Sequence, residues 1–264
     1  MKSILFAKNI SELFFQLKSN KELTVVGGCT HLDQLPEKSI STYGIQELNH
    51  ITRHERFLEI GPGTSLAQIL SIGQTHLPSV LYDSILSIAN PIIRNMATIG
   101  GNICIEGHKH TLFAPLIALD TKLELQSPAD TKLETLQNLK KIPDGYILKN
   151  IRIPLMYPEV SIFRRIGPEH TVTQHSASFV FLGDTERNTL VDVRLAFAGP
   201  FVFRSRTLEN AIIGHRLPLT KKDIDEIQEM VVGEFQKAAT DQMISDVVRQ
   251  QFLNLTRYSF EQLT

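Results

Sequence analysis

Apolar positions in the first half of the chain recur at two spacings, one typical of helices and one of strands. In residues 10–17, for example, Leu13, Phe14 and Leu17 lie three and four positions apart, as on one face of a helix. The pattern predicts helices at residues 10–17, 65–73, 80–89 and 112–119, and strands at residues 23–26, 57–60 and 122–126. The first two of these strands run directly into glycine turns.

The second half of the chain orders its elements differently. Residues 127–144 lose apolar periodicity, and we expect surface connections there. Strands are predicted at residues 147–153, 162–166, 177–182 and 190–197, and helices at residues 207–213, 223–238 and 244–263. Successive strands without intervening helices favour an antiparallel sheet with helices on one side. The predicted fold class is therefore α+β.

Composition places the chain among ordinary globular proteins, because 42% of its residues are apolar. It has 27 basic and 28 acidic residues and no Lys/Arg cluster that would follow a phosphate backbone, so nucleic acid is a poor candidate partner. No apolar run approaches the roughly 18–20 residues that span a bilayer. Lys8 and Glu12 interrupt the N-terminal stretch too early for a secretory signal. We expect a cytoplasmic protein without a membrane association.

Metal chemistry has little support in the sequence. Cys29 and Cys104 cannot supply the four thiolates of an iron–sulfur cluster, and a disulfide is not expected in a reducing compartment. His108 and His110 stand two apart, but an exposed polar loop is favoured over a metal site because no cysteine or acidic pattern lies nearby. No nucleophile–base arrangement is recognisable from spacing. We predict no metal site and no catalytic side chain.

Two glycine turns are the candidate binding features. The first glycine loop comprises Val26, Gly27, Gly28, Cys29, Thr30 and His31, and the second runs from Thr98 through Ile99, Gly100 and Gly101 to Asn102. Backbone N–H groups in such loops can converge on an anion, with a threonine hydroxyl as a further donor, and two loops together can hold a diphosphate. Ordinary tight turns are the alternative. Neither loop matches the three-glycine dinucleotide fingerprint or the nucleoside-triphosphate loop.

Three motifs in order resemble one known family. They are "VVGGCTHL" at residues 25–32, "EIGPGTSLAQIL" at 59–70 and "IIRNMATIGGNI" at 92–103, of which the third is the most specific. Further similar stretches are "APLIALDTKLEL" at 114–125, "ILKNIRIPL" at 147–155 and "RLAFAGPFVFRSRTLENAIIG" at 194–214. Together they resemble the flavin-binding subunit of the molybdenum hydroxylases, the xanthine dehydrogenase and carbon monoxide dehydrogenase family.

The resemblance implies a fold and a domain division. In that family, a two-part FAD-binding domain of the vanillyl-alcohol-oxidase/xanthine-dehydrogenase type precedes a small C-terminal domain with a three-stranded antiparallel sheet and helices. For this chain it implies an FAD-binding domain at residues 1–157, with subdomains at about residues 1–53 and 54–157, and a C-terminal domain at residues 158–264.

The resemblance also implies a cofactor, partners and binding residues. The subunit would bind FAD and pass electrons from a 2Fe–2S small subunit to NAD+ or another acceptor, beside a large subunit that carries the molybdenum cofactor. The residues that would contact FAD are Val26, Gly27, Gly28, Cys29, Thr30 and His31 in the first loop, Thr98, Gly101 and Asn102 in the second, and Ile88, His110 and Thr111 elsewhere.

Two positions depart from the family pattern. Thr111 stands where an aspartate usually bonds the ribityl arm of the flavin, and a neutral hydrogen bond contributes about 1 kcal/mol against about 1.5–3 for a bond to a charged group. Glu169 replaces a usual arginine, while Arg165 keeps the preceding basic residue. Two alternatives remain open at this point. One is a degenerate scaffold subunit with weak or no FAD binding, and the other is a stand-alone flavin oxidoreductase.

Overall fold

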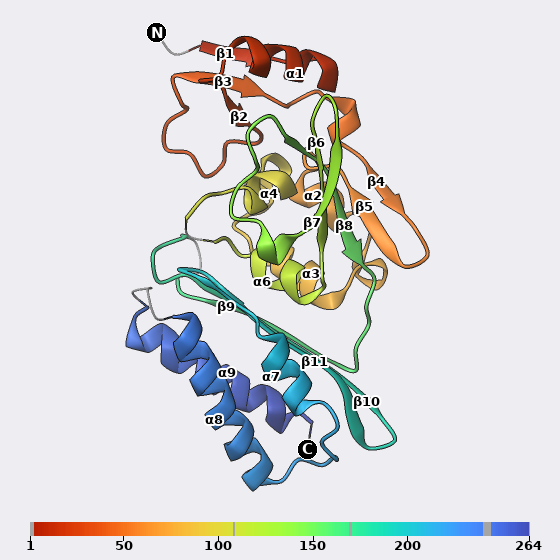
Figure 1. The fold of residues 1–264 in the computed structure, drawn as a ribbon, viewed down its shortest axis with the longest axis vertical. Helices are drawn as coiled ribbons and strands as arrows, with labels where there is room; N and C mark the ends of the chain where they lie inside the picture. Colours follow the sequence, from red (N-terminus) through yellow and green to blue (C-terminus); the bar gives the residue numbers. More distant parts are fainter. Residues whose placement is uncertain (1–2, 108, 169–170, 240–243, 264) are drawn as a thin grey trace. The chain divides into compact units, whose positions relative to one another are not determined.

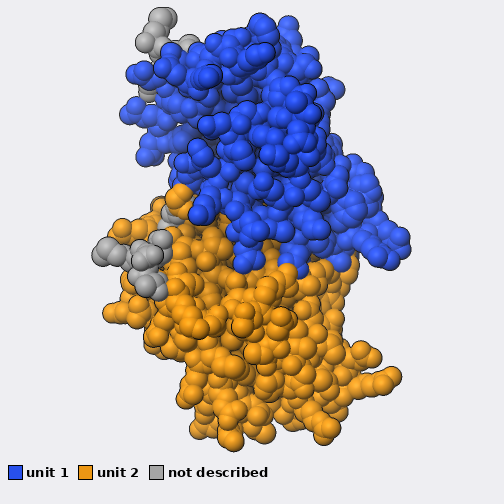
Figure 2. Space-filling model, in the orientation of Figure 1, with its two compact units in different colours: residues 1–76, 89–106, 119–155 blue, residues 77–88, 107–118, 156–264 orange. Residues whose placement is uncertain are grey.

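The computed structural model describes residues 3–107, 109–168, 171–239 and 244–263 (Figure 1). The chain forms two compact units that interleave along the sequence. Unit 1 comprises residues 1–76, 89–106 and 119–155, and unit 2 comprises residues 77–88, 107–118 and 156–264 (Figure 2). Each unit has its own sheets and helices. The units describe packing within the chain, and the domain division at residue 157 stays a prediction.

Unit 1 begins with a small parallel sheet. Its strands are β1 (Ser3–Phe6), β3 (Lys38–Ser41) and β2 (Thr24–Val26), in that spatial order. The predicted first helix is confirmed as α1 (Ile10–Ser19), whose N-cap Asn9 accepts a hydrogen bond from the backbone N–H of Glu12 at 2.8 Å. Leu13 of α1 and Ile40 of β3 are fully buried in one apolar cluster. The apolar spacing of this helix thus packs it on the sheet.

Unit 1 also contains a five-stranded antiparallel sheet. Its strands are β4 (Ile51–Arg53), β5 (Phe57–Ile60), β8 (Ile147–Pro154), β6 (Lys122–Gln126) and β7 (Thr131–Thr135), in that spatial order. The predicted strands β5, β6 and β8 are confirmed. The expectation of surface connections after residue 126 misses β7, because this edge strand has mostly exposed side chains and therefore no apolar pattern.

The remaining helices of unit 1 are short. They are the 3₁₀ turns η1 (Gln46–Leu48), η2 (Gln74–His76) and η3 (Leu136–Asn138), and the α-helices α2 (Leu66–Leu70), α4 (Pro91–Met96) and α5 (Ile99–Ile103). α2 is the helix predicted to begin at Ser65, whose hydroxyl accepts from the Gln68 N–H while the Gln68 side chain accepts from the Ser65 N–H. Gly73 closes this segment with a φ of +97°.

Unit 2 is built on a four-stranded antiparallel sheet. Its strands are β12 (Val202–Phe203), β11 (Thr189–Ala198), β10 (Ala177–Glu186) and β9 (Val160–Ile166), in that spatial order. Its helices are α3 (Ser79–Leu86), α6 (Phe113–Ala118), α7 (Arg206–Ile212), α8 (Lys221–Ala238) and α9 (Asp246–Glu261). The three long strands and all five helices were predicted, and the two-residue β12 extends the sheet by one strand.

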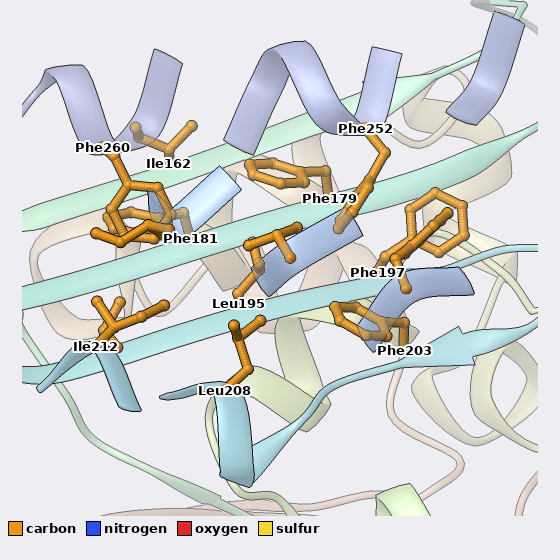
Figure 3. Packing of buried hydrophobic residues seen from close by; sticks show 14 of the residues in the cluster. Ile162, Phe179, Phe181, Leu195, Phe197, Phe203, Leu208, Ile212, Phe252 and Phe260 are labelled. Carbon is orange, nitrogen blue, oxygen red and sulfur yellow. The ribbon is translucent and has the colours of Figure 1, made fainter. Parts of the chain in front are cut away.

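The sheet of unit 2 is covered on both faces. Phe179 and Phe181 of β10 meet Phe252 and Phe260 of α9, with ring centroids 5.9 and 5.1 Å apart (Figure 3). Side chains alternate along a strand, so Val180, between Phe179 and Phe181, points to the opposite face of the sheet. There α6 packs on β10 and β11, and α3 packs on β9. The three C-terminal helices α7, α8 and α9 pack on one face, as expected, whereas the covering of the other face by α3 and α6 was not predicted. The continuous apolar run of β10 is typical of a strand buried on both faces.

Candidate functional site

The first glycine loop follows β2 in unit 1. The carbonyl oxygen of Val26 accepts a hydrogen bond from the backbone N–H of Thr42 at 3.0 Å, which fixes the end of the strand. Cys29 then adopts a left-handed conformation with a φ of +55°, uncommon for a residue with a side chain. A hydrogen bond of 3.3 Å from Leu32 N–H to the Cys29 carbonyl closes the turn. The side chains of Thr30 and His31 are exposed at its tip.

The two glycine loops are in direct contact within unit 1. A methyl group on Gly28 would place its carbon 1.9 Å from the carbonyl oxygen of Met96, and one on Gly27 would lie 3.1 Å from the Thr98 hydroxyl. Only glycine allows the backbone of the first loop to approach the end of α4 this closely. Sequence spacing could not reveal this contact, because about seventy positions separate its two sides.

The second glycine loop is a helix rather than an open loop. Residues 99–103 form α5, and the Thr98 hydroxyl caps it by accepting the Gly101 N–H at 3.0 Å. Gly100 donates to the Pro62 carbonyl at 2.9 Å, and a methyl group on Gly100 would lie 2.6 Å from Cβ of Pro62. Close packing and the helix cap therefore already use the N–H groups of Gly100 and Gly101, and the part of Thr98, Gly101 and Asn102 in a cofactor site stays a prediction. The spacing of Thr98 and Gly101 fits an N-cap and could have indicated the helix.

The first loop, by contrast, keeps its donors available. The backbone N–H groups of Gly28, Cys29 and Thr30 have no acceptor within the described part of the chain. Thr98, against which the loop lies, accepts through its oxygen and can still donate its own hydroxyl hydrogen. Successive N–H groups around a left-handed residue form a concavity suited to an anion. These residues therefore fit a phosphate-bearing cofactor.

The thiol of Cys29 is kept neutral in this loop. Its Sγ donates to the Gly27 carbonyl at 3.2 Å, and burial raises the pKa of the Cys29 thiol above its ordinary value of 9.0. A thiolate here would repel a bound anion, whereas the neutral thiol does not. The same burial makes the thiol a weak nucleophile at neutral pH.

Three predicted contact residues belong to unit 2. Ile88 follows α3, and its N–H donates to the Ile85 carbonyl at 3.1 Å. The His110 carbonyl accepts from the Phe113 N–H at 3.0 Å in the first turn of α6, and Thr111 is 9% exposed. Their part in a cofactor site stays a prediction.

Two other positions from the sequence patterns, His108 and Glu169, lie outside the described residues. Arg165, by contrast, is described and donates to the carbonyls of Pro168 and Thr171. Among the described residues, no three His, Cys, Asp or Glu side chains are grouped so that they could hold a metal ion. None of the described helices has the length and apolar character needed to span a bilayer.

Comparison with known proteins places these features in context. A family model described as the FAD binding domain in molybdopterin dehydrogenase matches residues 1–156. A xanthine dehydrogenase FAD-binding subunit from Escherichia coli O157:H7 is 28% identical over 215 residues, which cover 74% of this chain and 70% of that protein.

Two solved structures are similar over almost the whole chain. Carbon monoxide dehydrogenase from Hydrogenophaga pseudoflava, in a form that lacks the molybdenum-pyranopterin moiety, matches with a TM-score of 0.81 at 17% identity, over 99% of this chain and 95% of that chain. Quinoline 2-oxidoreductase from Pseudomonas putida 86 matches with a TM-score of 0.78 at 13% identity, over 100% and 95%. The predicted fold class is confirmed.

Proposed function

This chain belongs to the FAD-binding domain family of molybdopterin dehydrogenases, and from that premise we propose that it is the flavoprotein subunit of a molybdenum hydroxylase. In this role it holds FAD and transfers electrons from an iron–sulfur partner subunit to NAD+ or another acceptor. The observation that carries the proposal is the contact between the first glycine loop and residues 96–98, with three N–H donors left available beside it.

The diphosphate of FAD would be held by neutral donors. The N–H groups of Gly28, Cys29 and Thr30 and the hydroxyl of Thr98 are the donors that the structure leaves for it. Backbone dipoles of this kind bind phosphate oxygens without a fixed positive charge, and they need no rearrangement on binding. When bound, FAD supplies the acceptance and release of electrons, which side chains cannot provide.

The other contacts follow the family pattern. In unit 1 they are Val26, Gly27, His31, Gly101 and Asn102, and in unit 2 they are Ile88, His110 and Thr111. Thr111 in place of an aspartate weakens the bond to the ribityl arm, because a hydrogen bond to a neutral group contributes about 0.5–2 kcal/mol less than one to a charged group. We therefore propose that FAD binds, but less tightly than it would with an aspartate at this position.

The partners proposed for the chain are a large subunit with the molybdenum cofactor and a small subunit with 2Fe–2S clusters. Support comes from the similar E. coli protein, which is named as the FAD-binding subunit of a xanthine dehydrogenase. The given sequence has only two cysteines, too few to ligate a 2Fe–2S cluster, and we propose that the electron donor is the small subunit. We further propose a cytoplasmic complex and an FAD-binding domain at residues 1–157.

The absorption spectrum of the purified chain tests the proposal. We expect flavin bands that leave the protein on heating, return on incubation with FAD, and bleach on addition of dithionite. A folded chain that shows no flavin band and takes up no FAD would instead favour the scaffold alternative.

Co-purification tests the partners separately. The chain, purified from the cells that naturally produce it, should be isolated with an iron–sulfur subunit and a molybdenum subunit. Isolation of a flavin-loaded chain without either partner would favour the stand-alone oxidoreductase.

A further inference from the structure

The sequence motif at residues 194–214 is not explained by cofactor binding in unit 1. In the structure it contains most of the β11–β12 hairpin (residues 189–204) and all of α7. This hairpin contacts residues 109–118 of the same unit at three points. The Gly199 carbonyl accepts the Lys109 N–H at 2.8 Å, Arg194 donates to the Ala118 carbonyl at 3.0 Å, and Arg204 donates to the Ile117 carbonyl.

Arg194 and Arg204 supply hydrogen-bond donors to the carbonyl groups at the carboxyl end of α6. All six residues of α6 are buried, so water does not reach the last carbonyl groups of this helix. Helix ends leave these carbonyls without partners inside the helix, and a buried carbonyl without a donor is destabilising. Arg194 and Arg204 satisfy two of them with charged donors.

Arg204 is itself held by a buried carboxylate. Its side chain is 0% exposed and that of Glu209 is 3% exposed. Nε of Arg204 lies 2.8 Å from one Glu209 oxygen, and its terminal nitrogen lies 3.3 Å from the other. Glu209 also accepts the Leu195 N–H at 3.2 Å, which ties the pair to β11. Such a two-pronged pair fixes both position and orientation of the guanidinium group.

The amino end of the same segment is fixed as well. Gly199 sits where a methyl group would lie 2.8 Å from Cβ of Ala177, so the turn of the hairpin is pressed against β10 and its carbonyl cannot shift freely. Thr111 lies between the anchored Lys109 and the anchored carboxyl end of α6. It is followed by the buried Leu112 and by the first residue of α6, Phe113. The position of Thr111 therefore depends on where α6 is held.

We infer that Arg204, oriented by Glu209, is a positioning residue that fixes α6 and through it Thr111, the residue proposed to bond the ribityl arm of FAD. The positioning of α6 by Arg204 rests on the hairpin contacts, and its effect on FAD binding rests on the proposed function. It predicts that damage at Arg204 affects the flavin end of the cofactor without affecting the diphosphate end.

The test uses the full chain with Arg204→Lys, which keeps the charge and loses the two-pronged geometry. The matched control is Arg257→Lys, at an exposed pair in which Arg257 lies 2.8 Å from Asp225 in the same unit. In the absence of any ligand, hydrogen–deuterium exchange of residues 109–118 should become roughly tenfold faster in Arg204→Lys, the effect of losing one charge-assisted hydrogen bond. Exchange in residues 26–31 should not change.

Binding is then measured with two probes. FAD carries the ribityl arm, whereas ADP carries the diphosphate without it. Arg204→Lys should bind FAD roughly tenfold more weakly and ADP unchanged, while Arg257→Lys should bind both like the unaltered chain. Equal losses for FAD and ADP, or no loss for either, would overturn the inference, as would unchanged exchange in residues 109–118.

The inference and the proposed function fail in distinguishable ways. If the unaltered chain binds no FAD, the proposed function fails. If FAD binds and the exchange result is absent, only the positioning role fails. If Arg204→Lys does not fold, Arg194→Lys tests the same end of α6 from a partly exposed pair, with Arg194 2.9 Å from Asp192, and should give the same pattern to a smaller extent.

Discussion

At the scale of single residues, glycines that look equivalent in the sequence meet different surroundings in the structure. The sequence left anion-binding loops and ordinary turns open at the glycine doublets, and the structure adds close backbone approach of Gly28 to Met96 and of Gly100 to Pro62. The identity of the neighbours could not be predicted, because each comes from a segment remote in sequence. The left-handed Cys29 was also beyond prediction, since a residue with a side chain gives no such signal.

Replacing Gly28 by alanine should damage the contact between the two glycine loops. The new methyl carbon would lie 1.9 Å from a backbone oxygen, so the loop or α4 must move. Overpacking of this kind costs about 1–3 kcal/mol, and we expect that loss in the free energy of unfolding measured with urea.

Gly233→Ala is the matched control for this substitution. Gly233 lies inside α8, and a methyl group there would meet nothing within 4 Å. Alanine is favoured over glycine inside helices by about 0.5–1 kcal/mol, so this variant should be slightly more stable. If both variants behaved alike, the close approach at Gly28 would not be the cause.

Alkylation of Cys29 should depend on pH and on FAD. Because burial raises the pKa of the Cys29 thiol above 9.0, the reactive thiolate is scarcer at pH 8 than for an ordinary cysteine. Iodoacetamide labelling, followed by peptide mass spectrometry, should therefore increase with pH through a midpoint above 9.0. Added FAD should slow it further. Rapid labelling at neutral pH, unaffected by FAD, would contradict this account of the first glycine loop.

At the scale of elements, the sequence predicted long apolar runs best, and short elements where a turn or cap signal accompanies them. Long runs such as β11 and α8 were found to within two residues, because several turns or alternations reinforce one another, while the prediction for β10 ended four residues early. The strands β1, β3, β4 and β7 and the helices α4 and α5 were missed. Each has three to six residues, and equally short elements such as β2, β5 and α2 were predicted because a glycine turn or a capping box marks one end.

The capping box of α8 provides a prediction at this scale. The Thr220 hydroxyl accepts the Asp223 N–H at 3.2 Å, and the Asp223 carboxylate accepts from the Thr220 N–H at 2.8 Å. Thr220→Ala should lower the free energy of unfolding by about 0.5–2 kcal/mol. Thr207→Ala, at an exposed helical position of α7, is the control and should have no such effect.

The same box should respond to acid. Hydrogen bonds from Thr220 lower the pKa of Asp223 below its ordinary value of 3.8, so the folded state favours the carboxylate. The stabilisation is fully present above pH 3.8 and is lost as the pH falls through the lowered value. The difference between the unaltered chain and Thr220→Ala, measured by urea unfolding, should therefore shrink below pH 3.8. A difference that is independent of pH would show that the carboxylate does not contribute.

At the scale of the whole molecule, the fold class followed from the order of the elements, but the interleaving of the two units did not. The helices α3 and α6 lie in the first half of the sequence and pack on the sheet of unit 2. Nothing in their own residues indicates which sheet they cover. The candidate site was predicted in the same partial way. The glycine pattern left an anion site and an ordinary turn both open, and only the resemblance to a family named the cofactor.

The central claim is that the first glycine loop holds FAD against residues 96–98. Calorimetric titration of the flavin-free full chain with FAD tests it most directly, with Gly28→Ala beside it. We expect one FAD per unaltered chain and a clear loss of affinity in Gly28→Ala, with circular dichroism confirming that both are folded. A folded, unaltered chain that gives no binding isotherm with FAD, or a Gly28→Ala chain that binds it equally well, would contradict the claim.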